Sequence, residues 1–234
     1  MSAWADLRQV VLATTDPTGV AGVLRSRLRL GAGFGDPELA AHGITDDTMA
    51  VGPHAFVEVV SPTTDDHPLA VWLAGRGGSA GYLLSVQVSD VDSCLQRCHT
   101  AGIRVALTQL VQGHRIAQLH RGDMSAGLEL DGVAQRGRWF WDDLDIDRPE
   151  DARVDDVVAV DVAVEDPAGV AARWGLVLDL APTTPTSLDL GGRLVRFVPR
   201  GGRGGIVAID LHAVDRAGDP GTEFAVGGVQ VRLV

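Results

Sequence analysis

The chain has 234 residues, of which 45% are hydrophobic and 22% are charged, as is usual for a globular protein with a core of its own. Its formal net charge is −11 at pH 7 and it contains no lysine, which excludes a lysine Schiff base and argues against nucleic acid as a partner. No stretch approaches the ~20 apolar residues that span a membrane, and the first residues lack the pattern of a signal peptide, so we expect a cytoplasmic protein.

The first predicted unit begins with an apolar strand, QVVLATT, and a helix start, DPTGVA at residues 16–21. Asp before Pro is a common helix start. Asp caps free backbone N–H groups, and Pro lacks a backbone N–H, which would have no partner in the first turn of a helix. The unit ends in strands that include HAFVEVVSP at residues 54–62. Between them, GAGFGD at residues 31–36 follows a helix rather than a strand, so we do not expect it to cradle a phosphate.

The second predicted unit repeats this order. The strand LLSVQVS precedes Asp90, which takes the place of Asp16, and a helix follows. Cys94 and Cys98 share one face of this helix, and we expect buried thiols rather than a disulfide or a zinc site. The unit closes with antiparallel strands in GHRIAQLHRGDMSAGLELDG, residues 113–132.

An acidic segment that is poor in aliphatic residues, 136–156, predicts a linker between two domains. The aromatic cluster Trp139-Phe140-Trp141 is expected to pack at the domain interface, and a lid over a pocket is the alternative.

A third and a fourth unit follow the linker. The strand AVDVAVE and the helix start DPAGVA, residues 166–171, nearly repeat the letters of the first unit, which indicates duplication. The run LDLGGRLVRFV (188–198) matches FAVGGVQVRLV (224–234), and each Gly-Gly pair predicts a hairpin. In the fourth unit Asp215 takes the place of Asp16, and a short loop replaces the helix.

Repeated β-α-β-β-β units resemble the vicinal oxygen chelate superfamily, which includes glyoxalase, methylmalonyl-CoA epimerase, extradiol dioxygenases and bleomycin- or fosfomycin-resistance proteins. The likeness is closest over residues 56–105, FVEVVSPTTDDHPLAVWLAGRGGSAGYLLSVQVSDVDSCLQRCHTAGIRV. The resemblance implies an α+β, glyoxalase-like fold in which tandem βαβββ units form two curved half-barrel domains. We expect these domains at residues 1–135 and 157–234, with a degenerate fourth unit.

The resemblance also implies a metal site in a cleft, with ligands from the first and last strands of two paired units. These positions fall on Gln9, Glu58 and Glu129, while the fourth falls on Leu83, which cannot bind a metal. An all-oxygen set suits hard cations, so we expect a divalent cation such as Mg²⁺ or Mn²⁺, or no metal. Without a metal, Glu58 and Glu129 would form a catalytic carboxylate pair, and burial and like charge would raise the pKa of one of them.

The equivalent positions of the second domain cannot bind a metal: Ala159, Arg196, Ala208 and Arg232. The two arginines would bind an anion in a cleft, or would simply alternate outward into solvent.

Three histidines belong to the hairpin strands of the first domain or flank them: His54, His114 and His120. For His120 we expect a local structural role in a turn. His114 or His120 is the candidate for supplying the ligand that Leu83 withholds, although their spacing does not demand it.

Two functions remain open from the sequence. One is an enzyme, a lyase, isomerase or epimerase, that moves a proton beside a carbonyl of a small acid or thioester through Glu58 and Glu129. The other is a non-catalytic protein that binds and sequesters a small molecule, as resistance proteins of this superfamily do. Both have a small-molecule ligand, and a homodimer is compatible with either.

Overall fold

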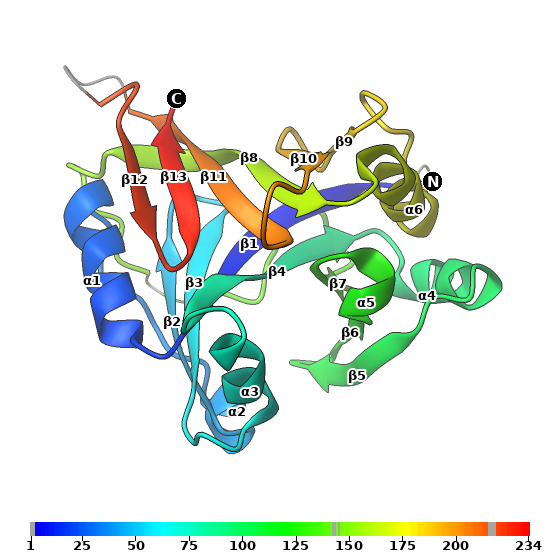
Figure 1. Cartoon of the computed structure of the whole chain (residues 1–234), viewed down its shortest axis with the longest axis horizontal. Coiled ribbons are helices and arrows are strands. Elements are labelled where there is room, and N and C mark those ends of the chain that lie inside the picture. Colours follow the sequence, from blue (N-terminus) through cyan, green and yellow to red (C-terminus); the bar gives the residue numbers. More distant parts are fainter. Residues whose placement is uncertain (1–2, 142–143, 145, 215–218) are drawn as a thin grey trace. The chain divides into compact units, whose positions relative to one another are not determined.

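The computed structural model describes the whole chain except residues 1–2, 142–143, 145 and 215–218. It contains two β-sheets and helices, so the predicted α+β class is confirmed (Figure 1). The order of strands in the first sheet is β2-β3-β1-β4-β7-β6-β5, and in the second it is β12-β13-β11-β8-β10-β9.

The first sheet contains the strands β1 (Ala5–Thr14), β2 (Ile44–Ala50), β3 (Phe56–Pro62), β4 (Ser79–Val88), β5 (Val105–Val111), β6 (His114–Leu119) and β7 (Gly127–Asp131). The second contains β8 (Val154–Val164), β9 (Ser187–Asp189), β10 (Leu194–Pro199), β11 (Gly205–Ala213), β12 (Glu223–Val226) and β13 (Val229–Leu233). The helices are α1 (Pro17–Leu28), α2 (Pro37–Ala41), α3 (Pro68–Ala74), α4 (Val91–Thr100), α5 (Arg121–Met124) and α6 (Pro167–Leu178).

The chain folds into two compact units, and each combines segments from distant parts of the sequence. Unit 1 comprises Met1–Arg8, Leu83–Asp143 and Ala159–Ile206, and unit 2 comprises Gln9–Tyr82, Leu144–Val158 and Val207–Val234. Unit 1 therefore holds most of the second and third repeats, and unit 2 holds most of the first and fourth. The division into two contiguous domains, residues 1–135 and 157–234, stays a prediction.

Each repeat pairs its first strand with its last strand in parallel: β1 with β3, β4 with β7, β8 with β10, and β11 with β13. The register is also shared, because Val11, Ser85, Asp161 and Asp210 lie opposite Glu58, Glu129, Arg196 and Arg232. The predicted tandem βαβββ repeats are therefore confirmed, and positions that the sequence alignment treats as equivalent occupy equivalent places.

The repeated helix start has a physical reason. Asp16 accepts a hydrogen bond from the backbone N–H of Gly19, and Asp166 accepts one from Gly169, each at 3.0 Å. A Cβ atom on Gly19 or Gly169 would lie only 2.2 or 2.1 Å from the capping carboxylate. The motif Asp-Pro-X-Gly thus needs its glycine, because the cap lies directly over that residue.

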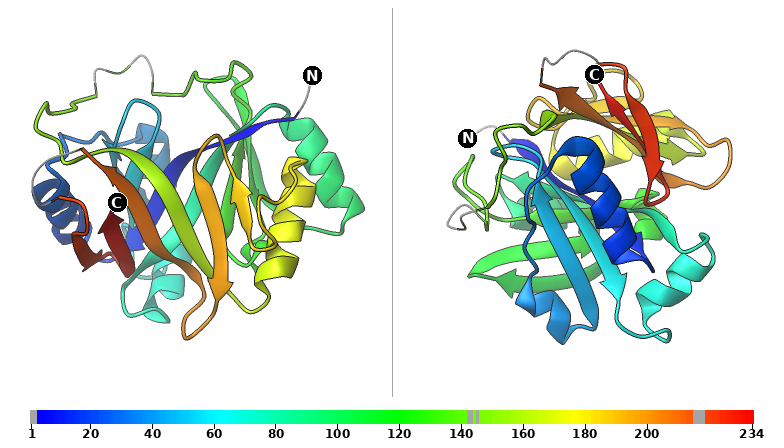
Figure 2. Two further views of the ribbon diagram at one scale, coloured as in Figure 1. Left: turned by 90° about the horizontal axis from the view of Figure 1, so that it is seen from above. Right: turned by 90° about the vertical axis from the view of Figure 1, so that its left-hand side faces the viewer.

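Helices cover the sheet faces within each unit. In unit 2, α1 packs on β2 and β3, and in unit 1, α6 packs on β9 and β10 (Figure 2). The inner faces are apolar, as the buried residues Leu24, Leu28 and Trp174 show. Cys94 and Cys98 of α4 are free and buried as predicted, and burial raises the pKa of Cys98 to about 11.

The fourth repeat is degenerate as predicted. Asp215 lies outside the described residues, and the described residues between β11 and β12 form no helix. Gly227 and Gly228 connect β12 and β13 with φ angles of 56° and 79°, a left-handed conformation that only glycine adopts readily. Glycines 191 and 192 lie in the same conformation between the antiparallel strands β9 and β10, so both predicted hairpins are confirmed.

Residues 31–36, the strap of unit 2, take the place of one strand of the first repeat. Phe34 forms an antiparallel bridge with Thr48 of β2, with backbone hydrogen bonds of 3.0 and 2.8 Å. A Cβ atom on Gly33 would lie 1.9 Å from a carboxylate oxygen of Asp47, so glycine lets the strap run this close to β2. The glycine-rich stretch therefore has a structural role.

Within the described residues, no helix combines the length and the apolar character needed to cross a membrane.

Candidate functional site

The first polar cluster lies in unit 2 on the face of the sheet that is opposite to α1. Strand alternation turns Gln9 and Glu58 to one face, while Val10 and Leu12 of β1 turn to the other. The amide Nε2 of Gln9 donates to Oε2 of Glu58 at 3.3 Å, and the two residues are only 7% and 8% exposed. Thr48 of β2, which is 1% exposed, lies directly across from Glu58.

Asp46 lies on the same face of β2 as Thr48, two residues earlier. Both of its carboxylate oxygens accept the backbone N–H of Asp36, at 2.9 and 3.0 Å, and so tie the end of the strap to β2. Burial raises the pKa of Asp46 to about 6; the Asp36 N–H lowers it, and the charges of Asp36 and Asp47 add to the rise. Asp47 turns to the opposite face and pairs with Arg25 of α1 at 2.6 Å.

The second polar cluster lies in unit 1 around Glu129 of β7. Ser85 of β4 donates to its Oε1 at 3.2 Å, and Gln118 of β6 donates to its Oε2 at 2.8 Å. Both partners are direct cross-strand neighbours of Glu129. Burial raises the pKa of Glu129, and the hydrogen bonds from Gln118 and Ser85 oppose the rise. A half-buried glutamate is therefore biased toward its protonated form while its orientation is fixed.

Asp131 follows Glu129 on the same face of β7 and is 1% exposed. The hydroxyl of Ser85 also lies within hydrogen-bonding distance of Asp131. Because a serine hydroxyl carries one proton, it can donate to only one of the two carboxylates at a time. Ser85 thus joins Glu129 and Asp131 into one polar cluster.

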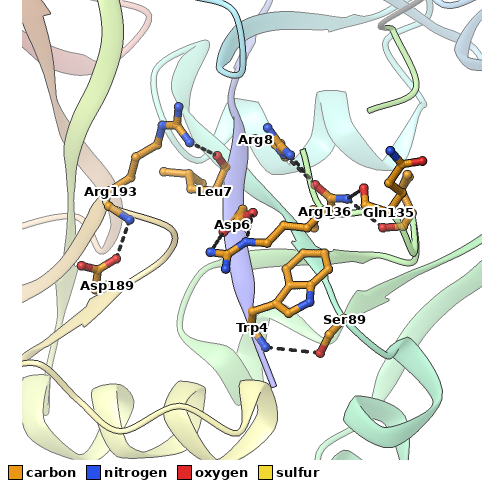
Figure 3. A network of polar contacts seen from close by, with 12 residues as sticks. Trp4, Asp6, Leu7, Arg8, Ser89, Gln135, Arg136, Asp189 and Arg193 are labelled. Atoms are coloured by element: carbon orange, nitrogen blue, oxygen red, sulfur yellow. Dashed lines mark hydrogen bonds and ion pairs between the residues drawn. The ribbon is translucent and has the colours of Figure 1, made fainter. Parts of the chain in front are cut away.

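Arg8 of β1 takes part in a buried polar network of unit 1. Its Nε donates to Oε1 of Gln87 at 2.9 Å, and the amide of Gln87 donates to the carbonyls of Val133 and Gln135 at 2.7 and 3.0 Å. The guanidinium of Arg8 also lies 5.6 Å from the centre of the Trp139 ring, within the range of a cation–π contact. These contacts connect the segment after β7 to β1 and β4 (Figure 3).

A second set of contacts holds the start of β1 in unit 1. Arg136 forms a two-pronged ion pair with Asp6, at 2.9 and 2.7 Å, and Arg193 donates to the backbone carbonyl of Leu7 at 3.3 Å (Figure 3). Trp4 lies beside Ser89, and the N–H of Ser89 donates to its carbonyl at 3.0 Å.

The structure brings together two of the predicted site residues, Gln9 and Glu58. Glu129 belongs to unit 1, so its convergence with this pair stays a prediction, as does its catalytic role. Leu83 is 5% exposed on β4 and lies opposite Gly127. Sequence reasoning missed Ser85, Gln118 and Asp131, although the alternation of LLSVQVS already places Ser85 on the face of Leu83.

The predicted ligand set Gln9, Glu58 and Glu129 stays a prediction, because Glu129 lies in unit 1 and the other two lie in unit 2. Within the described residues, no three or more His, Cys, Asp or Glu side chains gather in a group that could hold an ion. Gln9 turns its amide N–H, rather than its carbonyl oxygen, toward Glu58. A divalent cation needs several oxygen ligands around one point, and Gln9 and Glu58 supply one amide and one carboxylate that already bind each other.

Arg196 and Arg232 each have a carboxylate partner in the structure, and the binding of an anion by these arginines stays a prediction. Arg196 pairs with Asp161 at 2.6 Å, and Arg232 pairs with Asp210 at 2.5 Å, each directly across a parallel strand pair. The side chains of the two arginines are 35% and 29% exposed, so they do not simply extend into solvent. In the third and fourth repeats, an internal ion pair therefore lies where the first two repeats carry glutamates.

His120 and His114 each lie next to a side chain of the same unit. His120 precedes α5, and its Nδ1 lies 3.8 Å from Asp123, which agrees with a local structural role. The ring of His114 packs edge-on against Phe140 at 5.7 Å between centres. Phe140 also packs against Trp139 at 4.9 Å, and whether this aromatic cluster lies at a domain interface stays a prediction.

No family model and no curated protein matches the chain. Among solved structures, it is similar to the hypothetical protein BH1468 from Bacillus halodurans C-125, with a TM-score of 0.50 and 16% identity over 58% of this chain and 99% of that one. Together with the tandem repeats, of which the fourth is degenerate, this likeness decides the fold. The chain has the fold of the vicinal oxygen chelate superfamily.

Two further solved structures with this fold are methylmalonyl-CoA epimerases. The enzyme from Mycobacterium tuberculosis is 23% identical over 56% of this chain and 89% of that one, with a TM-score of 0.48. A Streptomyces coelicolor variant in complex with 2-nitronate-propionyl-CoA is 19% identical over 55% of this chain and 94% of that one, with a TM-score of 0.48. At these identities and TM-scores the comparison with the epimerases leaves the activity of this chain open.

Proposed function

We propose that the protein is an enzyme that moves a proton beside the carbonyl group of a small acid or thioester. Glu129 is the acid–base group, and Glu58 is the second carboxylate. The environment of Glu129 is the observation that supports this most. Burial raises the pKa of Glu129, and Ser85 and Gln118 donate hydrogen bonds to its two carboxylate oxygens. A general acid or base works best when its pKa lies close to the working pH.

The proposed chemistry needs two steps. A carboxylate removes the proton from the carbon next to the carbonyl, and the electron pair of the broken C–H bond moves into an enolate. The proton, or another from the second carboxylate, then returns to the same carbon or to a neighbouring atom. Return to the opposite face of the carbon gives an epimer, and return elsewhere gives an isomer. Glu58 and Glu129 must both reach the substrate for the first outcome.

The steps are written for the two carboxylates alone, and the predicted divalent cation at Gln9, Glu58 and Glu129 stays a prediction. Enolate charge would instead be balanced by hydrogen-bond donors and by the carboxyl proton itself.

The test is hydrogen exchange at carbon. The purified chain is incubated in D₂O with a panel of 2-substituted acyl thioesters and 2-substituted carboxylic acids, and loss of the α-proton is followed by NMR. We expect exchange with one substrate class, and its loss in Glu129→Gln. Glu223→Gln, which changes an exposed glutamate of β12, is the matched control and should leave exchange unchanged. Exchange that is equal in the wild type and Glu129→Gln would contradict the proposal.

A sequestering protein is the second candidate. It is favoured by the incomplete ligand set, because the fourth predicted ligand position is Leu83, which cannot bind a metal. The same panel separates the two functions. A ligand that raises the melting temperature and is recovered with its α-proton intact indicates sequestration rather than catalysis.

A further inference from the structure

The strap of unit 2, residues 31–36, has little apolar contact to hold it in place. It reads GAGFGD, and every second residue is a glycine. Glycine loses more backbone freedom on folding than any other residue, so ordering this segment is unfavourable in entropy. Within the strap only Gly31 is buried, and its one large apolar side chain, Phe34, is partly exposed. Segments with few buried apolar contacts open locally without unfolding of the whole protein.

Carboxylates take the place of strand carbonyls along the strap. The backbone N–H of Phe34 donates to a carbonyl of β2 at 3.0 Å, as in an ordinary ladder. The N–H groups two residues before and two residues after it donate to side chains instead. Ala32 donates to Asp147 at 3.1 Å, and Asp36 donates to both oxygens of Asp46 at 2.9 and 3.0 Å. The attachment of the strap to unit 2 therefore depends on charged groups.

The strap itself covers the carboxylate of Asp46. A Cβ atom on Gly35 would lie 3.6 Å from Oδ1 of Asp46, so the strap backbone lies directly against this group. A carboxylate taken out of water is destabilised in its charged form, and water reaches it again when the strap opens. Burial raises the pKa of Asp46 to about 6, as this cover requires.

The charges around Asp46 add to the effect of burial. Asp36 at the end of the strap and Asp47 on β2 both disfavour a second negative charge at Asp46. Arg25 does not compensate, because it binds Asp47 on the opposite face of β2 at 2.6 Å. The other charged or titratable residues of the elements that pack against β2 are Glu58 of β3, Glu38 of α2 with its C-cap His42, and Arg27 of α1.

We propose that the strap is a pH-sensitive cover on the edge of the first sheet. It lies closed on β2 while Asp46 holds a proton, and it opens more often once Asp46 is charged. Thr48, the residue of β2 that pairs with Phe34, lies directly across from Glu58. Opening of the strap therefore frees the strand that borders the polar cluster of Gln9 and Glu58, so that pH controls how firmly this cluster is enclosed.

Proton linkage gives the direction and the size of the effect. Asp46 takes up a proton below about pH 6 in the closed state and near its usual value of 3.8 when the strap is open. Between these values opening releases a proton, so opening becomes more favourable as the pH rises. The two pKa values set an upper limit of roughly a hundredfold in the opening equilibrium, and partial exposure of Asp46 reduces the expected change to about tenfold.

The experiment is amide hydrogen exchange of the full chain, followed by NMR between about pH 4.5 and about pH 7.5. Exchange rates are corrected for the intrinsic pH dependence of each amide and converted to opening constants. The N–H of Phe34 reports the strap, and the N–H of Val20, which donates to the carbonyl of Asp16 in α1, is the reference in the same unit. We expect the opening constant at Phe34 to rise about tenfold in the wild type and to stay constant in Asp46→Asn.

Two further variants serve as controls, and circular dichroism checks that each of them folds. Asp147→Asn removes the carboxylate at the other end of the strap and should keep the pH dependence of the wild type. Gly33→Ala should open the strap more at every pH, because its Cβ atom would lie 1.9 Å from a carboxylate oxygen of Asp47. The proposal is overturned by a wild-type opening constant that is independent of pH or falls as the pH rises, or by a rise that persists in Asp46→Asn.

Discussion

Asp46→Asn should stabilise the protein at neutral pH, and the gain should disappear in acid. Burial raises the pKa of Asp46 from 3.8 to about 6. Between these two pH values the folded chain holds a proton at Asp46 that the unfolded chain has lost. Stability contributed by this group therefore falls as the pH rises through this window. Asparagine resembles the protonated acid, and its Oδ1 can still accept the N–H of Asp36.

The magnitude follows from the pKa. A rise from 3.8 to about 6 corresponds to about 3 kcal/mol as an upper bound. Asp46 is only partly buried, and solvent screening reduces the effect to roughly 1–2 kcal/mol. The stability of Asp46→Asn minus that of the wild type should therefore increase by this amount between pH 4 and pH 7.5.

The assay is urea unfolding of both proteins at several pH values, because the difference between them cancels the titration of all other groups. Asp47→Asn is the matched control. Asp47 is the next residue on β2 but pairs with Arg25, so loss of the Asp47 charge should destabilise the protein at neutral pH. A stability difference for Asp46→Asn that is constant, or that shrinks as the pH rises, would refute the reasoning.

Four further results are expected. Gly169→Ala should cost about 1–2 kcal/mol in thermal unfolding, because its Cβ would meet the cap of Asp166, whereas Gly22→Ala in α1 has open space and should be neutral or slightly stabilising. Arg196→Gln should cost about 1–3 kcal/mol, because it leaves the carboxylate of Asp161 without its cross-strand partner, and Asp161→Asn in the same chain should recover part of the loss. Deleting residues 157–234 should cause aggregation, because it removes α6, whose Trp174 Nε1 donates to the carbonyl of Met124 at 2.9 Å; a soluble and fully active fragment 1–135 would contradict this. Metal analysis of the purified protein should find no stoichiometric Zn²⁺, Ni²⁺ or Fe²⁺, and one tightly bound transition metal per chain would point to a histidine ligand outside Gln9, Glu58 and Glu129.

The sequence by itself determined the repeats and their local geometry. Asp16 and Asp166 cap their helices because Asp-Pro-X-Gly carries the acceptor, the N-terminal proline and the space for the cap within four residues. The period of two along FVEVV also placed Glu58 on one face of its strand. Such features depend on neighbours in the chain, so a single sequence is enough to predict them.

The tertiary structure decided which residues surround each glutamate and each arginine. Ser85 and Gln118 reach Glu129 only because β4 and β6 lie on either side of β7, and Asp161 neutralises Arg196 because β8 and β10 pair in one particular register. A shift of one residue in that register would turn each side chain to the other face of the sheet. Register between distant strands depends on how the whole sheet packs its core, and no local pattern of residues records it.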